Sequence, residues 1–288
     1  MDQLAGLFKL AKQDYDAYEV CACDKVGMVG RHAVEKLVEE TSLNFLSQLH
    51  GKDYSECRHN DSFCRPFLAG QFIQSASDFQ KRWKVMLDAR RPDKEAIELP
   101  PEEINTVLYT AIAAFSACYD IWKPMSRKTP GTFFELLLGS VLEGILPRHK
   151  RSKFIPIPNQ SEKVSTDIVF STDNPNEAGL VIPAKITTRE RIVQPYAHQR
   201  ILDAVFGKGK YKSVLMCVSE IQRKVDNTAN EICVPGTIRL FQSHLASLDG
   251  IMYLDPPYRY LQDDVTGVVR VGKIGDFLAS GLAELLNH

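Results

Sequence analysis

Three residues in the second half of the chain have the types and the spacing needed to act on a phosphate ester. Asp167 begins one apolar stretch, Lys185 ends another 18 residues later, and Glu135 lies in an apolar segment that precedes both. Mg²⁺ prefers oxygen ligands and is usually held by one or two carboxylates together with phosphate oxygens. A lysine nearby can orient the attacking water or take its proton. The set therefore fits metal-assisted phosphodiester cleavage.

The segments around these residues are predicted to alternate between helix and strand. The first is a helix from Thr129 that carries Glu135 and is stopped by Pro147. The expected elements after it are strands at 153–157, 167–171 and 179–187, a helix at 189–206, a strand at 213–219, a helix at 237–248 and a strand at 250–254. This order predicts an α/β (α+β) fold with a mixed central β-sheet flanked by helices. Residues at strand ends are then well placed to share one cleft.

Residues 1–128 have a different sequence pattern and are predicted to be mainly helical. Apolar residues from Val34 to Leu49 recur at helical spacing, and further helices are expected at 72–87 and 101–122. Pro100 and Pro101, followed by two glutamates, favour a helix start. We therefore expect two regions, a helical one at 1–128 and a catalytic core at 129–288.

The helix with Glu135, the hairpin with Asp167 and the strand ending at Lys185 resemble the nuclease core of type II restriction endonucleases, the PD-(D/E)xK superfamily. The resemblance runs from about Pro130 to Leu254. It implies a mixed central sheet, Mg²⁺ dependence, double-stranded DNA as substrate and 5′-phosphate products. It also implies that Asp167 binds the metal and that Lys185 positions the water.

The sequence departs from the family pattern at two positions. Thr166 precedes Asp167 where the family has proline, and Pro183 stands two residues before the lysine, where the second acid belongs. A proline side chain cannot bind metal. Glu135 and Glu190 are the candidates to replace that acid, and Asp203 is more distant. We favour Glu135, because a helix packed on the hairpin can present it beside Asp167, whereas Glu190 suits the first turn of a helix.

Basic charge is concentrated around this set. Residues 121–224 hold 17 basic and 9 acidic residues, a net charge of +8, whereas the remainder holds 18 and 27, a net charge of −9. Such a patch favours nucleic acid as the partner. The predicted DNA-binding residues after the lysine are Thr187, Arg189, Arg191, Gln194, His198, Gln199 and Arg200, and those before the first strand are Arg148, Lys150, Arg151 and Lys153. A solvated helix face is the alternative for His198, Gln199 and Arg200.

These observations predict a Mg²⁺-dependent, sequence-specific double-stranded DNA endonuclease of a restriction-modification system. A symmetric site calls for a homodimer, with dimer or DNA contacts from residues 1–128, and a cognate DNA methyltransferase is expected in the same system. A non-catalytic DNA-binding protein on a degenerate nuclease core is one alternative, suggested by Pro183. Asp255-Pro-Pro-Tyr258 suggests another, a DNA adenine methyltransferase, but Gly207 follows a helix where the cofactor loop should follow a strand.

Other classes are disfavoured by what the sequence lacks. It has no secretory signal pattern at the start and no apolar run long enough for a membrane span. Seven scattered cysteines are typical of a reducing compartment. We therefore expect a cytoplasmic protein that does not bind a membrane. Five residues could bind zinc, although their spacing misses the usual pairs and incidental thiols are favoured: Cys21, Cys23, Cys57, His59 and Cys64.

Overall fold

The structure is a computed structural model of the chain. It describes residues 2–17, 27–49, 69–122, 128–174, 177–223 and 229–287. No helix among these residues is long and apolar enough to cross a membrane.

Helices dominate the N-terminal part of the described chain. They are α1 (Asp2–Ala17), α2 (Gly27–Leu49), the short η1 (Ala69–Gln71), α4 (Ala76–Asp88) and α5 (Pro101–Trp122), with a small hairpin of β1 (Arg90–Arg91) and β2 (Ala96–Ile97) before α5. Helix α4 begins after Ser75, whose side chain accepts a hydrogen bond from the backbone of Asp78. Helix α5 begins at Pro101 with Glu102 and Glu103 in its first turn, as the sequence predicts.

A seven-stranded mixed sheet forms the centre of the molecule. Its strands are β3 (Lys150–Pro156), β4 (Lys163–Ser171), β5 (Gly179–Ile182), β6 (Ala184–Lys185), β7 (Tyr211–Cys217), β10 (Gly250–Tyr253) and β11 (Val271–Lys273). The order is β11-β10-β7-β5-β4-β3, and β6 also pairs with β7. Strands β3, β4 and β5 are antiparallel neighbours, whereas β5, β7, β10 and β11 are parallel. The predicted mixed sheet is confirmed.

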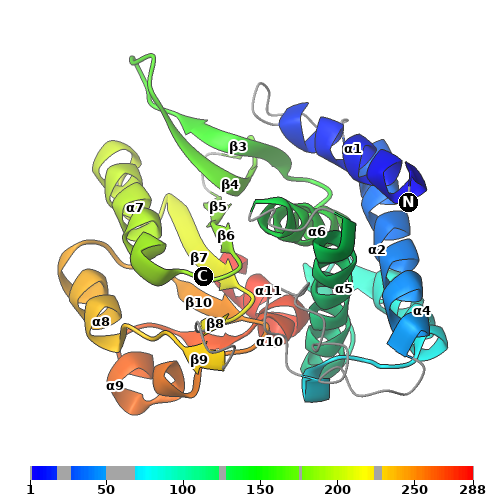
Figure 1. Cartoon of the computed structure of the whole chain (residues 1–288). Coiled ribbons are helices and arrows are strands. Elements are labelled where there is room, and N and C mark those ends of the chain that lie inside the picture. Colours follow the sequence, from blue (N-terminus) through cyan, green and yellow to red (C-terminus); the bar gives the residue numbers. More distant parts are fainter. Residues whose placement is uncertain are drawn as a thin grey trace.

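Helices cover both faces of this sheet (Figure 1). Helix α6 (Thr129–Ile145) and α5 lie on one side, and α7 (Val193–Phe206) and α8 (Pro235–His244) lie on the other. The alternation of side chains along the strands produces two cores. In β4, Ile168 and Phe170 pack with α5 and α6, while Val169 between them packs with Leu202 of α7.

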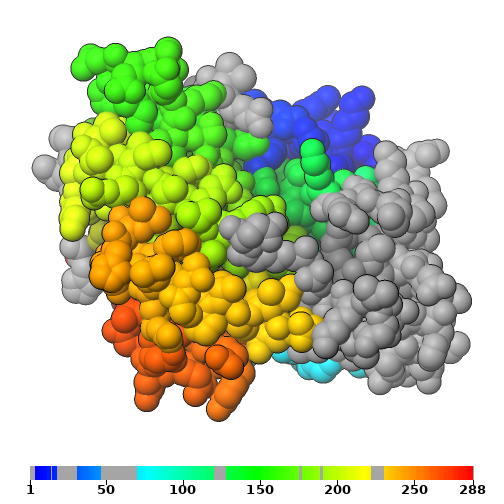
Figure 2. Space-filling view, turned by 60° about the vertical axis from the view of Figure 1, so that its left-hand side comes forward, coloured from blue at the N-terminus to red at the C-terminus, as the bar shows by residue number. Residues whose placement is uncertain are grey.

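The remaining elements are a short helix before α7 and the elements that follow β7. They are η2 (Arg189–Ile192), β8 (Ile221–Arg223), β9 (Ala229–Glu231), η3 (Tyr258–Leu261), α9 (Asp263–Thr266), α10 (Ile274–Asp276), the π-helical η4 (Phe277–Gly281) and α11 (Leu282–Asn287). The space-filling view shows one side of the molecule built from the β3–β4 hairpin at the top, α7 below it, and then α8 and α9 (Figure 2). The β8–β9 hairpin and β11 were not predicted from the sequence.

The strand expected at residues 179–187 is interrupted. Proline has no N–H to donate to a neighbouring strand, and Pro183 separates β5 from β6. Strand β5 pairs with both β4 and β7, whereas β6 pairs with β7, with Lys185 opposite Cys217. The break leaves Lys185 at the end of a short strand in the middle of the sheet.

Candidate active site

Asp167 of β4 and Lys185 of β6 are in direct contact. The Nζ of Lys185 donates a hydrogen bond to Oδ2 of Asp167 at 2.5 Å. The side chains of Lys185 and Asp167 are 13% and 19% exposed, respectively. Partial burial lowers the effective dielectric and strengthens this charge pair. The structure thus brings together the two residues that the sequence singled out first.

The strand break at Pro183 accounts for the orientation of the Asp167 carboxylate. Pairing of β4 with β5 ends at Ile168 and Ile182, one residue short of Asp167 and Pro183. Beyond the proline, the backbone N–H of Ala184 donates to Oδ2 of Asp167 at 2.8 Å. The carboxylate therefore takes the place of a backbone partner, and its orientation is fixed by the interruption of the strand.

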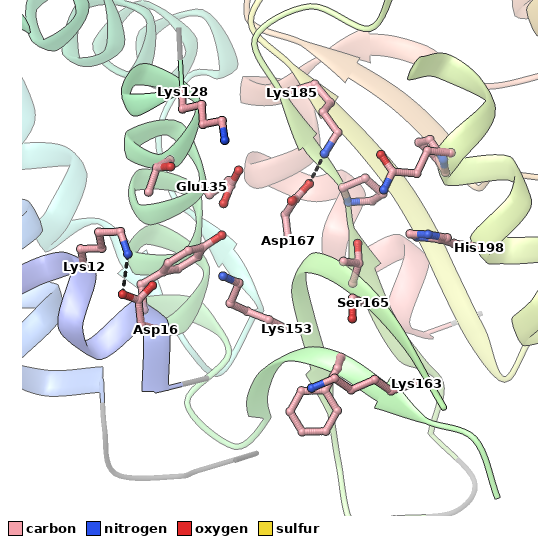
Figure 3. A pocket seen from close by; sticks show the side chains of 17 residues that line it. Lys12, Asp16, Lys128, Glu135, Lys153, Lys163, Ser165, Asp167, Lys185 and His198 are labelled. Atoms are coloured by element: carbon pink, nitrogen blue, oxygen red, sulfur yellow. Dashed lines mark hydrogen bonds and ion pairs between the residues drawn. The ribbon is translucent and has the colours of Figure 1, made fainter. Parts of the chain in front are cut away.

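Glu135 of α6 lines the same cleft as Asp167 and Lys185 (Figure 3). Burial and the negative charge of Asp167 raise the pKa of Glu135 to about 8, although Lys185, Lys153 and Arg151 oppose the shift. When two neighbouring carboxyl groups are both ionised, their negative charges repel each other, and a cation bound between them removes this repulsion. The electrostatics of the pair therefore fit a bound divalent ion, and the oxygen donors fit Mg²⁺.

The cleft around these residues has a volume of about 740 Å³ and a mostly basic lining. Five lysines line it, namely Lys12, Lys128, Lys153, Lys163 and Lys185, against the three acids Asp16, Glu135 and Asp167. Some of these ammonium groups are held in place by aromatic rings: Lys153 Nζ lies 3.6 Å from the ring centroid of Tyr15, and Lys163 Nζ lies 4.5 Å from that of Phe154. A basic lining of this kind attracts a polyanion.

Helix α1 forms one wall of the cleft and was not predicted to do so. Its residues Lys12, Tyr15 and Asp16 line the cavity, and Lys12 pairs with Asp16 at 2.5 Å (Figure 3). They lie 119 to 123 residues before Glu135 in the chain. Nothing in the local sequence distinguishes them from other surface residues, because only the tertiary fold brings α1 beside the β3–β4 hairpin.

Three of the predicted DNA-binding residues line the cleft: Lys153, Gln194 and His198. His198 projects from α7 on the side opposite α6 (Figure 3). Burial lowers the pKa of His198, and Asp167 and Lys185 act on it with opposite signs. A mainly neutral imidazole therefore faces the cleft at neutral pH. Thr187 and Arg191 lie just past Lys185, where Arg191 is exposed and its guanidinium donates to the carbonyl of Thr187 at 3.3 Å.

Other predicted DNA-binding residues lie elsewhere. Gln199 is buried on α7, where its amide nitrogen donates to Asp203 and to the carbonyl of Tyr211. Arg151 is 5% exposed and pairs with Glu143 at 3.0 Å. The remaining members of this group are Arg148 and Arg200, both exposed and outside the cleft lining, and Lys150, which pairs with Asp173 at 2.7 Å. Asp203 also lies outside the cleft lining.

Some predictions fall outside the described residues. The backbone of Arg189 and Glu190 forms the start of η2, but their side chains are not part of the description. The five residues considered for zinc, Cys21, Cys23, Cys57, His59 and Cys64, also lie outside it.

The Asp255-Pro-Pro-Tyr258 motif follows β10 and does not adjoin a nucleotide-binding loop in the described structure. The carboxylate of Asp255 accepts a hydrogen bond from Gln71 at 2.8 Å, and Tyr258 is 72% exposed. Gly207 ends α7 with a φ of 90° and opens no helix. The motif connects β10 to η3, and its Asp255 contacts Gln71 of η1.

Comparisons with known proteins agree with this fold. A scan of protein-family models and a search of curated proteins gave no match. Among solved structures, the crystal structure of the type IIP restriction endonuclease Kpn2I matches with a TM-score of 0.79 and 33% sequence identity, covering 96% of each chain. The complex of the restriction endonuclease PspGI with substrate DNA gives a TM-score of 0.44 and 14% identity, over 73% of this chain and 91% of that one.

The similarity to Kpn2I extends over nearly the whole chain and combines fold with sequence. The chain belongs to the type II restriction endonucleases. It is therefore a site-specific deoxyribonuclease, and the resemblance and the enzyme class predicted from the sequence are confirmed. The methyltransferase alternative has no support in this fold.

Proposed function

We propose that this protein hydrolyses phosphodiester bonds of double-stranded DNA at a specific sequence, with Mg²⁺ as cofactor and 5′-phosphates as products. The observation that carries the proposal is the cluster of Asp167, Lys185 and Glu135 in one basic cleft. Each of the three comes from a different element, and the β4–β6 contact and α6 hold them together.

Asp167 and Glu135 are the proposed metal ligands. Among the described residues, no group of three or more His, Cys, Asp or Glu side chains gathers into a metal site. Two carboxylates are a usual number of protein ligands for Mg²⁺, because the ion keeps several waters and substrate oxygens. When bound, the ion stabilises the charge that develops on the phosphate and lowers the pKa of a bound water. Glu190 remains the alternative to Glu135 as the second metal ligand beside Asp167.

Lys185 is proposed to orient the attacking water. Its ammonium group is fixed by Asp167 at 2.5 Å and stands at the end of a strand that is anchored to β7. A positioned donor of this kind reduces the reorganisation that the reaction needs. The same positive charge also faces the phosphate, so Lys185 has a second, electrostatic effect on the developing charge.

The remaining cleft residues are proposed to bind the DNA. Lys153 and Lys163 suit contacts to backbone phosphates, because lysine is a point charge without base specificity. The segment after Lys185, with Thr187, Arg189 and Arg191, is proposed to face the bases, since arginine can bind guanine through two hydrogen bonds. Gln194 and His198 also line the cleft and are proposed to contact the DNA there.

The wider setting is also a proposal. A symmetric recognition sequence requires two copies of the site, so we propose a homodimer in which each protomer cuts one strand. The helical region 1–128 would supply dimer or DNA contacts to the core at 129–288. We also propose a cytoplasmic location and a cognate DNA methyltransferase in the same restriction-modification system, which would protect the host DNA.

Cleavage of unmethylated DNA tests the proposal. Purified protein is incubated with phage or plasmid DNA in Mg²⁺ and, in parallel, in EDTA, with Lys185→Ala as the control variant. We expect discrete fragments with 5′-phosphate ends that require Mg²⁺ and are absent with the variant. Intact DNA in every Mg²⁺ arm, from a folded protein that still binds DNA, would show that the chain is a binding protein and not a nuclease.

A further inference from the structure

Glu220 is a fully buried carboxyl group that the proposed chemistry does not use. It follows β7, has 0% exposure and does not line the catalytic cleft. A carboxylate in the protein interior is costly unless its oxygens accept several hydrogen bonds. The identity of its donors therefore indicates what this residue does.

The described donors come from two different elements. The backbone N–H of Thr188 lies 3.0 and 3.2 Å from the two carboxylate oxygens, and the hydroxyl of Thr188 donates at 2.5 Å. The hydroxyl of Tyr253, in β10, donates at 3.0 Å. Glu220 thus joins the interior of the sheet to the backbone of the segment that follows Lys185.

Thr188 stands at a critical point of that segment. The backbone of Lys185 and Ile186 accepts hydrogen bonds from Val218 and Ser219, so the segment is fixed to the end of β7 as far as Ile186. Thr188 is 1% exposed, and its carbonyl accepts the N–H of Arg191 at 2.9 Å to start η2. Glu220 is therefore the anchor at which the chain turns from the catalytic strand into η2.

We infer that Glu220, acting through Thr188, is a positioning residue for DNA-sequence discrimination. The inference rests on the proposed function, in which Thr187, Arg189 and Arg191 face the bases. Thr187 and Arg189 flank Thr188 directly, and the Thr188 carbonyl holds the N–H of Arg191. Release of Thr188 from Glu220 would move these residues together while leaving the Lys185–Asp167 contact in place.

The two kinds of donor allow a matched pair of variants. Thr188→Val keeps the shape of the side chain and removes the hydroxyl, so that only the backbone N–H of residue 188 still donates to Glu220. Tyr253→Phe removes a hydroxyl from the same carboxylate, but β10 carries none of the proposed DNA contacts. Both variants lose one buried hydrogen bond to Glu220, so a general effect on stability acts on both. Thr188→Ser restores the hydroxyl at the segment and serves as the rescue.

The experiment measures cleavage rates on short duplexes. The cut site is first mapped on unmethylated phage DNA, and kcat/KM is then compared for a duplex with that site and for duplexes with one base pair changed. We expect Thr188→Val to lower the ratio of these values about tenfold or more, since small misplacements at a reacting site are costly. Tyr253→Phe and Thr188→Ser should keep the ratio within about twofold of wild type, by the same reasoning.

The outcomes separate this inference from the proposed function. If the wild-type chain cuts no DNA, the proposed function fails and the inference falls with it. If the wild type cuts and Thr188→Val keeps its discrimination, the inference alone is refuted. Equal losses in Thr188→Val and Tyr253→Phe, with equal drops in melting temperature, would also refute it by showing a merely structural role. Glu220→Gln gives a second check, with a larger loss of discrimination expected than in Tyr253→Phe, because one carboxylate oxygen is replaced by an NH2 group that cannot accept from Thr188.

Discussion

The raised pKa of Glu135 makes an unusual prediction for the metal-free protein: Glu135→Gln should stabilise it at alkaline pH. In the unfolded chain this carboxyl ionises near 4.5, whereas in the folded protein its pKa is about 8. Between these values the folded protein binds the extra proton, so its free energy of unfolding falls as the pH rises. The glutamine variant carries no such proton and loses no stability through this group.

The size of the effect follows from the shift. Each pH unit between the two pKa values costs about 1.4 kcal/mol when one proton is involved. From pH 5 to pH 8 the wild type should therefore lose up to about 4 kcal/mol relative to Glu135→Gln. Burial and the neighbouring charge of Asp167 are the causes of the shift. Because a bound cation cancels both, saturating Mg²⁺ should remove most of the difference.

The assay is urea unfolding in EDTA at pH 5, 6, 7 and 8, followed by the same series in Mg²⁺. Glu162→Gln is the control for loss of a carboxyl group, since Glu162 is exposed in the β3–β4 hairpin. The reasoning is refuted if Glu135→Gln and wild type lose stability in parallel from pH 5 to pH 8. It is also refuted if Mg²⁺ stabilises the variant as much as the wild type, because Glu135 would then be no ligand.

Three further predictions concern the cleft and its support. Asp167→Asn should remain folded but lose DNA cleavage by about a thousandfold or more, measured as single-turnover rates in Mg²⁺, because the amide is a poor metal ligand. Lys153→Ala should weaken binding of DNA duplexes in Ca²⁺ by the same factor for every sequence. The magnitude of the slope of log affinity against log salt concentration should fall by about one. An unchanged slope would show that Lys153 does not contact phosphates. Gly139→Ala should destabilise the protein by about 1–3 kcal/mol in urea unfolding, because a Cβ there would lie 2.2 Å from the Arg151 guanidinium; wild-type stability would contradict the packing described.

The element order of the core could be read from the sequence because each element is marked by local signals. Proline residues lie at both ends of the helix that carries Glu135, and the apolar run Ile168–Phe170 is buried in β4. Helix α5 was predicted with its observed bounds, since Pro101, Glu102 and Glu103 define its start. Local chemistry of this kind is independent of the rest of the fold, so a single sequence is sufficient to show it.

Contacts between distant elements could not be predicted in this way. Tyr15 packs under Lys153 only because α1 folds beside the hairpin. Gln199 belongs to a polar stretch that reads as a solvated helix face, yet it is buried against Ser213 and Asp203. A buried glutamine and an exposed one have the same sequence signature. Their difference is decided by which face of α7 meets the sheet, which is a property of the whole fold.

Pro183 is both a local sequence signal and a residue whose effect depends on contacts between distant elements. In the sequence it is a defect, because it occupies the place of the second acid before Lys185. In the structure it ends the pairing of β5 with β4, and the next N–H, from Ala184, is bound by Asp167. We propose that Glu135 on α6 replaces the missing acid, and burial and the nearby charge of Asp167 raise its pKa. In this proposal the site keeps two carboxylates and a lysine, and one carboxylate comes from a helix instead of a strand. Replacement of Pro183 by glutamate should therefore not improve cleavage, because it would add a third negative charge beside two that already require a cation.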